Sequence, residues 1–389
     1  MKIAYCLNSI KGFGGIQRVT IVKANSLAEI SGNSVYILVT DHQNDFQCEL
    51  LSPKVTLIDL NIRYYEDDWH KTWKSRVSQF KKRFRHKAAL KNVLHELQPD
   101  VVIAVGQSEK FFCTKNLRLK SKPIYIREIH FATNYREKLS KSLASKISGK
   151  IQSFLDFGLF CRIQYDMIVC LTPEDLKENW KGRKNVVNMP NPLTLVSNDI
   201  LGKTVEQIRE IKKIVAVGRL SYPKNFQSLI RSFKLISDRY PEWKLEIYGE
   251  GSDRVLLEQL IIQLTLQKQV FLMGGNDNLG RVLDCASFLV LSSESEGFPL
   301  VLLEAMDHWL PVIAYDCQFG PSHIITQDID GFLVEQNNEV FLADRMQYLM
   351  NDAGLRRRMG INAKDKASAF MPQSLAKRWM DLFNLVRRN

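Results

Sequence analysis

The chain lacks paired cysteines and long hydrophobic runs. Its seven cysteines are scattered over 389 residues, and no two have the C-x-x-C spacing of zinc or redox sites. This pattern argues against a disulfide scaffold and predicts buried thiols in a reducing compartment. No run of 18 or more apolar residues exists, so we expect no membrane-spanning helix. The opening MKIAYCLNSI reads as a strand rather than a signal peptide, so we expect a cytoplasmic protein.

The composition is that of a soluble globular protein, with 45% hydrophobic and 25% charged residues. The length fits two domains rather than one core. The net charge is +12, and it is unevenly distributed. Residues 1–200 hold 31 Lys and Arg against 19 Asp and Glu, whereas residues 201–389 hold 23 of each. The first half therefore carries the whole excess, which predicts an anionic partner for that half.

Apolar, β-type runs alternate with helical patterns along the chain, as in parallel sheets with helical crossovers. The sequence predicts an α/β fold of two Rossmann-like, doubly wound domains that face a cleft. The segment Asn188–Pro192 interrupts the pattern. We predict an N-terminal domain at 1–193, a linker at 194–213, a C-terminal domain at 214–372 and a helix at 373–389 that crosses back to the first domain. The predicted strands are 2–8, 35–40, 55–60, 101–105, 124–126, 167–171, 214–217, 245–248, 270–272, 288–291, 312–314 and 331–334.

Two cations follow the first predicted strand of the C-terminal domain. Strand 214–217 ends in Gly218-Arg219-Leu220, and Lys224 stands five residues after Arg219. Ligands of open α/β sheets bind at the carboxyl ends of the strands, where Arg offers a planar fork and Lys a point charge. These two residues are therefore candidates to grip a diphosphate, although two surface cations on a loop are also compatible.

A second motif follows strand 288–291. The sequence EGFPLVLLEAM at 296–306 places Pro299 and a following helix after a loop with Gly297. Free amides at a helix start favour anionic phosphates. Glu304 falls inside an apolar helical run, where a carboxylate needs a partner such as a sugar or ribose hydroxyl. The alternative interpretation is that these acids only stabilise the start of the helix through its dipole. That would explain Glu296 but would explain Glu304 poorly.

These motifs resemble, in order, the donor domain of retaining glycosyltransferases of family 4, which have the GT-B fold. The resemblance is strongest over about 214–335. One departure is His308-Trp309-Leu310, where the family usually has a small residue or Gly. The matching residues are Gly218-Arg219-Leu220, Lys224, the 296–306 segment, Pro311-Val312-Ile313, Asp316, Gly320-Pro321 and Gly331-Phe332-Leu333-Val334.

The resemblance implies a role for each matching residue. Arg219 and Lys224 would bind the donor diphosphate, Glu304 the ribose hydroxyls and Glu296 the donor sugar. The other expected donor-sugar contacts are Gly297, Phe298, Pro299 and Leu300. Gly14 and Gly15 match the family's Gly-Gly loop, which lies over the diphosphate.

In addition to Glu296, there are two further catalytic candidates, which follow the strand at 124–126. The resembling family often places a His or an acid here, against the donor sugar or the acceptor. His130 is favoured and Glu128 is its rival, and a purely structural role stays open for both. The Asp328-Ile329-Asp330 segment abuts Gly331 and reads as a turn, so we expect no metal and no cofactor, with the nucleotide diphosphate sugar as co-substrate.

Two basic amphipathic segments lie in the first half. Residues 71–91 hold nine Lys and Arg and no acid, with Trp73, Val77, Phe80, Phe84 and Ala88 on one helical face, and residues 138–160 show a similar stripe. One interpretation is a stripe packed in the core with a solvated basic back. The other is docking on an anionic membrane surface, or binding of a lipid-linked pyrophosphate acceptor. The basic candidates are Lys81, Lys82, Arg83, Arg85, Lys146 and Lys150.

Together these features predict a retaining transferase that moves a sugar from a UDP-sugar to a hydroxyl of a glycan acceptor, one that is lipid-linked. It would act as a peripheral protein on the inner face of the cytoplasmic membrane. The alternatives are a nucleotide-sugar epimerase or hydrolase of the same fold, and a transferase with a soluble sugar acceptor. No nucleic-acid module is recognisable, and no partner protein is implied. The sequence leaves open UDP against GDP, the sugar, the linkage, the acceptor and the oligomeric state.

Overall fold

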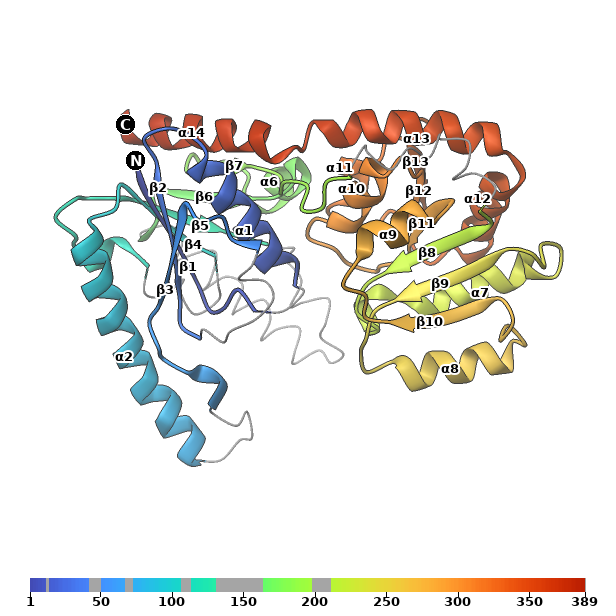
Figure 1. The fold of residues 1–389 in the computed structure, drawn as a ribbon, viewed down its shortest axis with the longest axis horizontal. Coiled ribbons are helices and arrows are strands. Elements are labelled where there is room, and N and C mark those ends of the chain that lie inside the picture. Colours follow the sequence, from blue (N-terminus) through green and yellow to red (C-terminus); the bar gives the residue numbers. More distant parts are fainter. Residues whose placement is uncertain are drawn as a thin grey trace. The chain divides into compact units, whose positions relative to one another are not determined.

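The computed structural model describes residues 1–11, 14–41, 50–66, 73–105, 113–130, 164–197 and 211–388. The chain forms two compact units, one of Met1–Pro192 with Pro372–Asn389 and one of Leu193–Met371. Each unit holds one sheet with helices packed against it (Figure 1). The predicted fold class of two Rossmann-like domains is therefore confirmed.

The sheet of the first unit has seven parallel strands in the order β3-β2-β1-β4-β5-β6-β7. Strand β7 was not predicted, because a three-residue edge strand leaves no long apolar run. The strands are β1 Lys2–Leu7, β2 Ser34–Val39, β3 Val55–Asp59, β4 Val101–Ala104, β5 Ile124–Glu128, β6 Met167–Cys170 and β7 Val186–Asn188. The helices are α1 Gly15–Ala28, η2 Tyr64–Glu66, α2 Trp73–Leu97, η4 Lys115–Leu117, α6 Pro173–Asn179 and α14 Pro372–Arg388.

The C-terminal helix α14 belongs to the first unit, as the sequence predicts. Its apolar residues recur at the 3–4 residue spacing of one helical face, which packs with α1 in the core of this unit. Figure 1 shows α14 in red beside the blue α1. Burial of large side chains such as Trp379 and Phe383 stabilises this attachment by roughly 1.5–3 kcal/mol each.

Helix α2 is only partly attached to its unit. Its C-terminal half packs in the core through Leu90 and Leu94, and His86 is fully buried. In its N-terminal half, however, the side chains of Phe80 and Phe84 are 61% and 63% exposed. The interpretation of this stripe as core-facing is therefore wrong for these two residues, because the helix extends beyond the sheet edge there (Figure 1).

The sheet of the second unit has six parallel strands in the order β10-β9-β8-β11-β12-β13. Its strand order reverses between β8 and β11, and such a switch point is where open α/β sheets bind ligands. The strands are β8 Lys213–Val217, β9 Lys244–Tyr248, β10 Val270–Gly274, β11 Phe288–Leu291, β12 Val312–Tyr315 and β13 Gly331–Val334. The helices are η7 Tyr222–Lys224, α7 Phe226–Ser237, α8 Arg254–Gln263, α9 Leu279–Asp284, α10 Leu300–Asp307, α11 Pro321–Ile324, α12 Glu339–Asn351 and α13 Ala353–Ser368.

Candidate functional site

The loops after β8 and β11 are bonded to each other at the switch point of the second unit. The hydroxyl of Ser292 donates to the carbonyl oxygen of Lys224 at 2.9 Å, and the Glu294 amide donates to the Pro223 carbonyl at 2.9 Å. Gly218 leaves room for the Lys224 stem, since a Cβ there would lie 3.0 Å from Lys224 Cε. Two motifs that the sequence places about 70 residues apart are thereby held side by side.

The ion pair between Lys224 and Glu296 is the centre of this arrangement. Lys224 Nζ lies 2.6 Å from Glu296 Oε1, and the two side chains are 23% and 12% exposed. Arg219 is exposed and has no side-chain hydrogen bond or ion pair with the rest of the described chain. The structure therefore joins two predicted donor-binding residues, and the loop that carries Lys224 also carries a second cation, Arg219.

The start of α10 offers unoccupied donors. Pro299 is its N-cap and supplies no side-chain cap, and the first turn contains no acid. Leu300 and Val301 carry the first amides of the helix, which favour an anion. Gly320 packs against this turn, because a Cβ there would lie 2.6 Å from Pro299 Cδ, and its φ of 123° suits only glycine.

Glu304 lies two turns into α10 and is buried, with 1% exposure. Its Oε1 accepts a hydrogen bond from the Thr194 hydroxyl at 2.5 Å. The apolar run around this carboxylate predicts a partner for it, and in the structure a threonine hydroxyl is one. The ribose-binding role of Glu304 stays a prediction.

Two glycines that were not among the predicted site residues shape the neighbouring loop. Gly249 and Gly251 follow β9, and a Cβ on them would lie 1.9 Å from the Gly218 carbonyl oxygen and 2.2 Å from that of Leu220. Gly249 also has a φ of 145°. Both contacts are with backbone, so a side chain would displace the loop that carries Arg219. The sequence signal was a Gly-x-Gly directly after a strand.

The departure from the resembling family at His308–Leu310 has a visible consequence. Trp309 has a φ of 61°, a conformation that costs a bulky residue more than glycine. Its carbonyl lies so close to α13 that a Cβ on Gly360 would stand 2.1 Å away. His308 Nδ1 lies 2.7 Å from Asp284 Oδ1. This segment therefore packs tightly without the expected small residue.

The two candidates of the first unit form one buried cluster with Lys23. Glu128 Oε2 lies 2.8 Å from Lys23 Nζ and 2.9 Å from His130 Nε2. Burial alone would raise the pKa of Glu128, but Lys23 and His130 outweigh it and lower that pKa to about 2. Burial lowers the pKa of His130, which Glu128 opposes. Glu128 is thus ionised and His130 neutral at pH 7.

The remaining predicted residues are distributed as follows. Gly14 is the N-cap of α1 and Gly15 its first residue, with no side-chain cap and no acid in the first turn. On α2, Lys82 and Arg85 donate to the backbone carbonyls of Arg63 and Asn61, which ties that helix to the loop after β3. Lys81 and Arg83 are exposed, whereas Lys146 and Lys150 lie outside the described residues.

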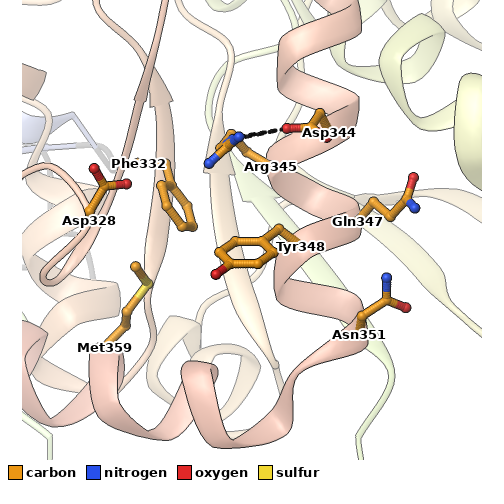
Figure 2. Close-up of a pocket in the computed structure, with 8 residues that line it drawn as sticks. All are labelled: Asp328, Phe332, Asp344, Arg345, Gln347, Tyr348, Asn351 and Met359. Atoms are coloured by element: carbon orange, nitrogen blue, oxygen red, sulfur yellow. Dashed lines mark hydrogen bonds and ion pairs between the residues drawn. The ribbon is translucent and has the colours of Figure 1, made fainter.

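A shallow pocket on β13, α12 and α13 contains none of the predicted site residues. Its Arg345 packs on the rings of Phe332 and Tyr348 and pairs with Asp344 at 2.7 Å (Figure 2). The described part of the chain contains no group of three His, Cys, Asp or Glu placed to hold a metal. Asp330 instead accepts from the Thr326 amide at 2.8 Å within its own turn. None of the described helices has the length and hydropathy needed to cross a membrane.

Known proteins resemble both halves of the chain. Residues 203–366 match the model of the family "Glycosyl transferases group 1". An uncharacterized glycosyltransferase of Haemophilus influenzae is 26% identical over 385 residues, 97% of this chain and 98% of that one. The GalNAc-alpha-(1->4)-GalNAc-alpha-(1->3)-diNAcBac-PP-undecaprenol alpha-1,4-N-acetyl-D-galactosaminyltransferase of Campylobacter jejuni is 24% identical over 389 residues, 100% of this chain and 99% of that one.

A solved structure has the same fold over the whole chain. It is a TarM mutant of S. aureus in complex with Fondaparinux, alpha-GlcNAc-glycerol and UDP. Its TM-score is 0.75 at 16% identity, over 98% of this chain and 99% of that one. Together with the fold, these similarities show that the chain is a glycosyltransferase of GT-B type. Its residues 203–366 are a glycosyl transferases group 1 domain.

Proposed function

We propose that the chain transfers a sugar from a UDP-sugar to a hydroxyl of a lipid-linked glycan, with retention at the anomeric carbon. The observation that supports this proposal most directly is the ion pair between Lys224 and Glu296. It lies next to the uncapped start of α10, at the switch point of the second sheet. A cation, a carboxylate and free amides there suit a sugar bonded to a diphosphate.

The donor half of the proposal follows from charge. The diphosphate leaves with negative charge, which Arg219, Lys224 and the amides of α10 would stabilise without a metal. Gly14 and Gly15, at the uncapped start of α1, are the proposed diphosphate contacts of the first unit. Glu296 would bind the donor sugar and Glu304 the ribose hydroxyls. The UDP in the TarM mutant structure supports uracil as the base.

We infer retention from the resemblance to family 4. Same-face attack, in which the leaving phosphate takes the acceptor proton, requires no enzymic nucleophile, and we propose none. His130 of the first unit would contact a sugar hydroxyl.

The acceptor half of the proposal draws on α2. Its exposed Phe80 and Phe84 rings stack edge to face at 4.8 Å beside the exposed cations Lys81 and Arg83. Aromatic rings beside cations suit an anionic lipid surface, so the chain would dock on the inner face of the cytoplasmic membrane without spanning it. The lipid carrier in the name of the Campylobacter jejuni relative supports a lipid-linked acceptor.

The test is a donor and acceptor panel with the purified chain. Thermal shift with UDP-, GDP- and ADP-sugars identifies the donor, and we expect UDP-sugars to stabilise the chain most. Transfer to undecaprenyl-diphosphate glycans is then followed in EDTA, and the new anomeric centre is assigned by NMR. An inverted centre would reject retention. Free sugar or an isomer as the sole product would establish the hydrolase or epimerase alternative, and transfer only to soluble sugars would reject the lipid-linked acceptor.

A further inference from the structure

A buried polar cluster in the first unit joins helix α1 to the end of β5. The side chains of Lys23, Glu128 and His130 are each 2% exposed, and both neighbours of Glu128 reach the same carboxylate oxygen. Trp379 of α14 closes the cluster, with its ring centroid 4.9 Å from Lys23 Nζ. Buried ion pairs are often no more stabilising than apolar residues of the same volume, so stability alone explains this pair poorly.

The cluster also contains polar atoms that the described chain leaves unsatisfied. His130 Nδ1, Glu128 Oε1 and the Tyr5 hydroxyl are buried and have no hydrogen-bond partner among the described residues. Tyr5 belongs to this cluster because its pKa is raised by burial and also by the charge of Glu128. Buried polar atoms are nearly always hydrogen-bonded, by protein, water or ligand. Three such atoms in one cluster therefore indicate a place for a polar ligand group.

The charges around His130 decide which of its nitrogens meets that group. Glu128 Oε2 faces Nε2 at 2.9 Å, at an angle outside that of a regular hydrogen bond. Burial most strongly disfavours a second proton on the ring, Lys23 from α1 and Arg127 from β5 act in the same direction, and Glu128 only partly offsets them. A neutral imidazole beside a carboxylate carries its proton on the nitrogen that faces it, which leaves Nδ1 as an acceptor.

We propose that Lys23 and Glu128 are positioning residues that hold His130 as a neutral imidazole whose Nδ1 accepts a hydrogen bond from a sugar hydroxyl. This inference rests on the proposed transfer reaction and separates the two candidates left by the sequence. Glu128 acts through His130 and does not touch the substrate. The interaction is a hydrogen bond only, and it transfers no proton.

The first test follows the His130 ring by NMR in the intact, 15N-histidine-labelled chain. The His130→Gln variant assigns its signals. We expect a neutral ring with the proton on Nε2 at pH 7. Lys23→Met should raise the pKa of His130 by about one pH unit or more, because Glu128 then attracts a ring proton unopposed. Lys23→Arg should restore the wild-type value.

The matched control is Lys54→Met. Lys54 pairs with Glu29 at 2.5 Å on the surface of the same unit, where both side chains are 58% exposed. Losing that pair should leave the His130 signals unchanged. A wild-type ring that is protonated at pH 7 would overturn the proposal, as would an identical titration in folded Lys23→Met.

The second test separates orientation from binding. Glu128→Gln and Lys23→Met should lower kcat about tenfold or more and change KM for the UDP-sugar by less than about threefold, whereas Lys23→Arg should retain activity. In His130→Gln, the substrate whose KM rises identifies the source of the hydroxyl. If Lys23→Met fails to fold, the double variant Lys23→Met/Glu128→Gln, which leaves no unpaired buried charge, replaces it. Unchanged kcat in these variants would overturn the proposal.

The two tests separate this inference from the proposed function. The NMR titration needs no substrate. Expected titrations in a chain that transfers no sugar would reject the transferase proposal and with it the hydroxyl contact, whereas unperturbed titrations in an active transferase would reject only the positioning role.

Discussion

Lys224 and Glu296, which are 72 residues apart in sequence, form an ion pair with Nζ 2.6 Å from Oε1. The pair means that the lysine expected to bind the diphosphate is already bonded to the carboxylate expected to bind the sugar. A donor that carries both groups would have to exchange this contact for two new ones. If these roles hold, the ion pair would compete with a diphosphate that carries no sugar.

The first prediction exploits this competition. Glu296→Gln should bind UDP more tightly, by roughly threefold to tenfold, because Lys224 loses its partner and is free for phosphate. The same variant should lose most of its transfer activity, since the proposed contact with the donor sugar would be lost. Isothermal titration with UDP and a transfer assay measure the two effects, which have opposite signs.

Lys224→Met is the companion variant, and it should weaken UDP binding and transfer together. If Glu296→Gln instead weakens UDP binding as Lys224→Met does, the pair does not compete with the diphosphate and its role is only to hold the two loops together.

The second prediction concerns the glycine contact beneath the Arg219 loop. Gly251→Ala would place a Cβ 2.2 Å from the Leu220 carbonyl oxygen, so the backbone must move. We expect a loss of about 1–3 kcal/mol in the free energy of unfolding of the second unit, and weaker UDP binding. Gly275→Ala is the control, because nothing lies within 4 Å of its Cβ position and its φ is ordinary. Equal stability and UDP affinity in the two variants would show that the loop tolerates displacement.

The third prediction is a pH dependence specific to the first unit. Burial lowers the pKa of His86 from 6.5 to about 4, so the unfolded chain binds a proton in this range that the folded chain does not. The contribution of neutral His86 to the free energy of unfolding is fully present above about pH 6.5 and is lost as the pH falls toward 4. By pH 5 the loss should be about 2 kcal/mol.

Hydrogen exchange of the intact chain at pH 7.5 and pH 5 measures this effect for each unit. Peptides of the first unit should lose protection at pH 5, and His86→Phe should remove most of that change. A change of equal size in His86→Phe would assign it to other groups, such as His130. Glu128, with its pKa of about 2, loses its contribution only between about pH 4.5 and 2 and does not interfere.

The sequence could place the candidate donor residues at one edge of the second sheet because parallel strands impose a simple rule. Twelve of the strands were predicted, and loops at their carboxyl ends gather at one edge, so Arg219, Lys224 and Glu296 could be placed together before the structure was known. Which of them would pair could not be predicted, because the Lys224–Glu296 distance depends on how two loops far apart in sequence are bonded to each other.

The cluster at Glu128 was beyond sequence reasoning for a different reason. Lys23 lies 105 residues away, on a helix where a lysine is normally solvated, and only its burial beneath Trp379 reveals its partner. The exposure of Phe80 and Phe84 was equally hidden, because an apolar stripe has the same spacing whether it packs in the core or projects from the sheet.

The last prediction tests these two rings as a membrane contact. Phe80→Ser/Phe84→Ser should lower the fraction of chain that floats with anionic vesicles, with a partition coefficient reduced about tenfold or more by the lost apolar area. Leu385→Ser is the control, because Leu385 is 57% exposed on α14 of the same unit.

The cations beside these rings are tested in the same way. Lys81→Gln/Arg83→Gln should weaken the free energy of vesicle binding by about 2 kcal/mol, or roughly thirtyfold in the partition coefficient, at low salt and by less at high salt. Lys181→Gln/Lys184→Gln removes the same charge from the loop before β7 and should change binding far less. Equal losses in the α2 variants and their controls would show that surface charge and apolar area in general, rather than this helix, bring the chain to the lipid surface.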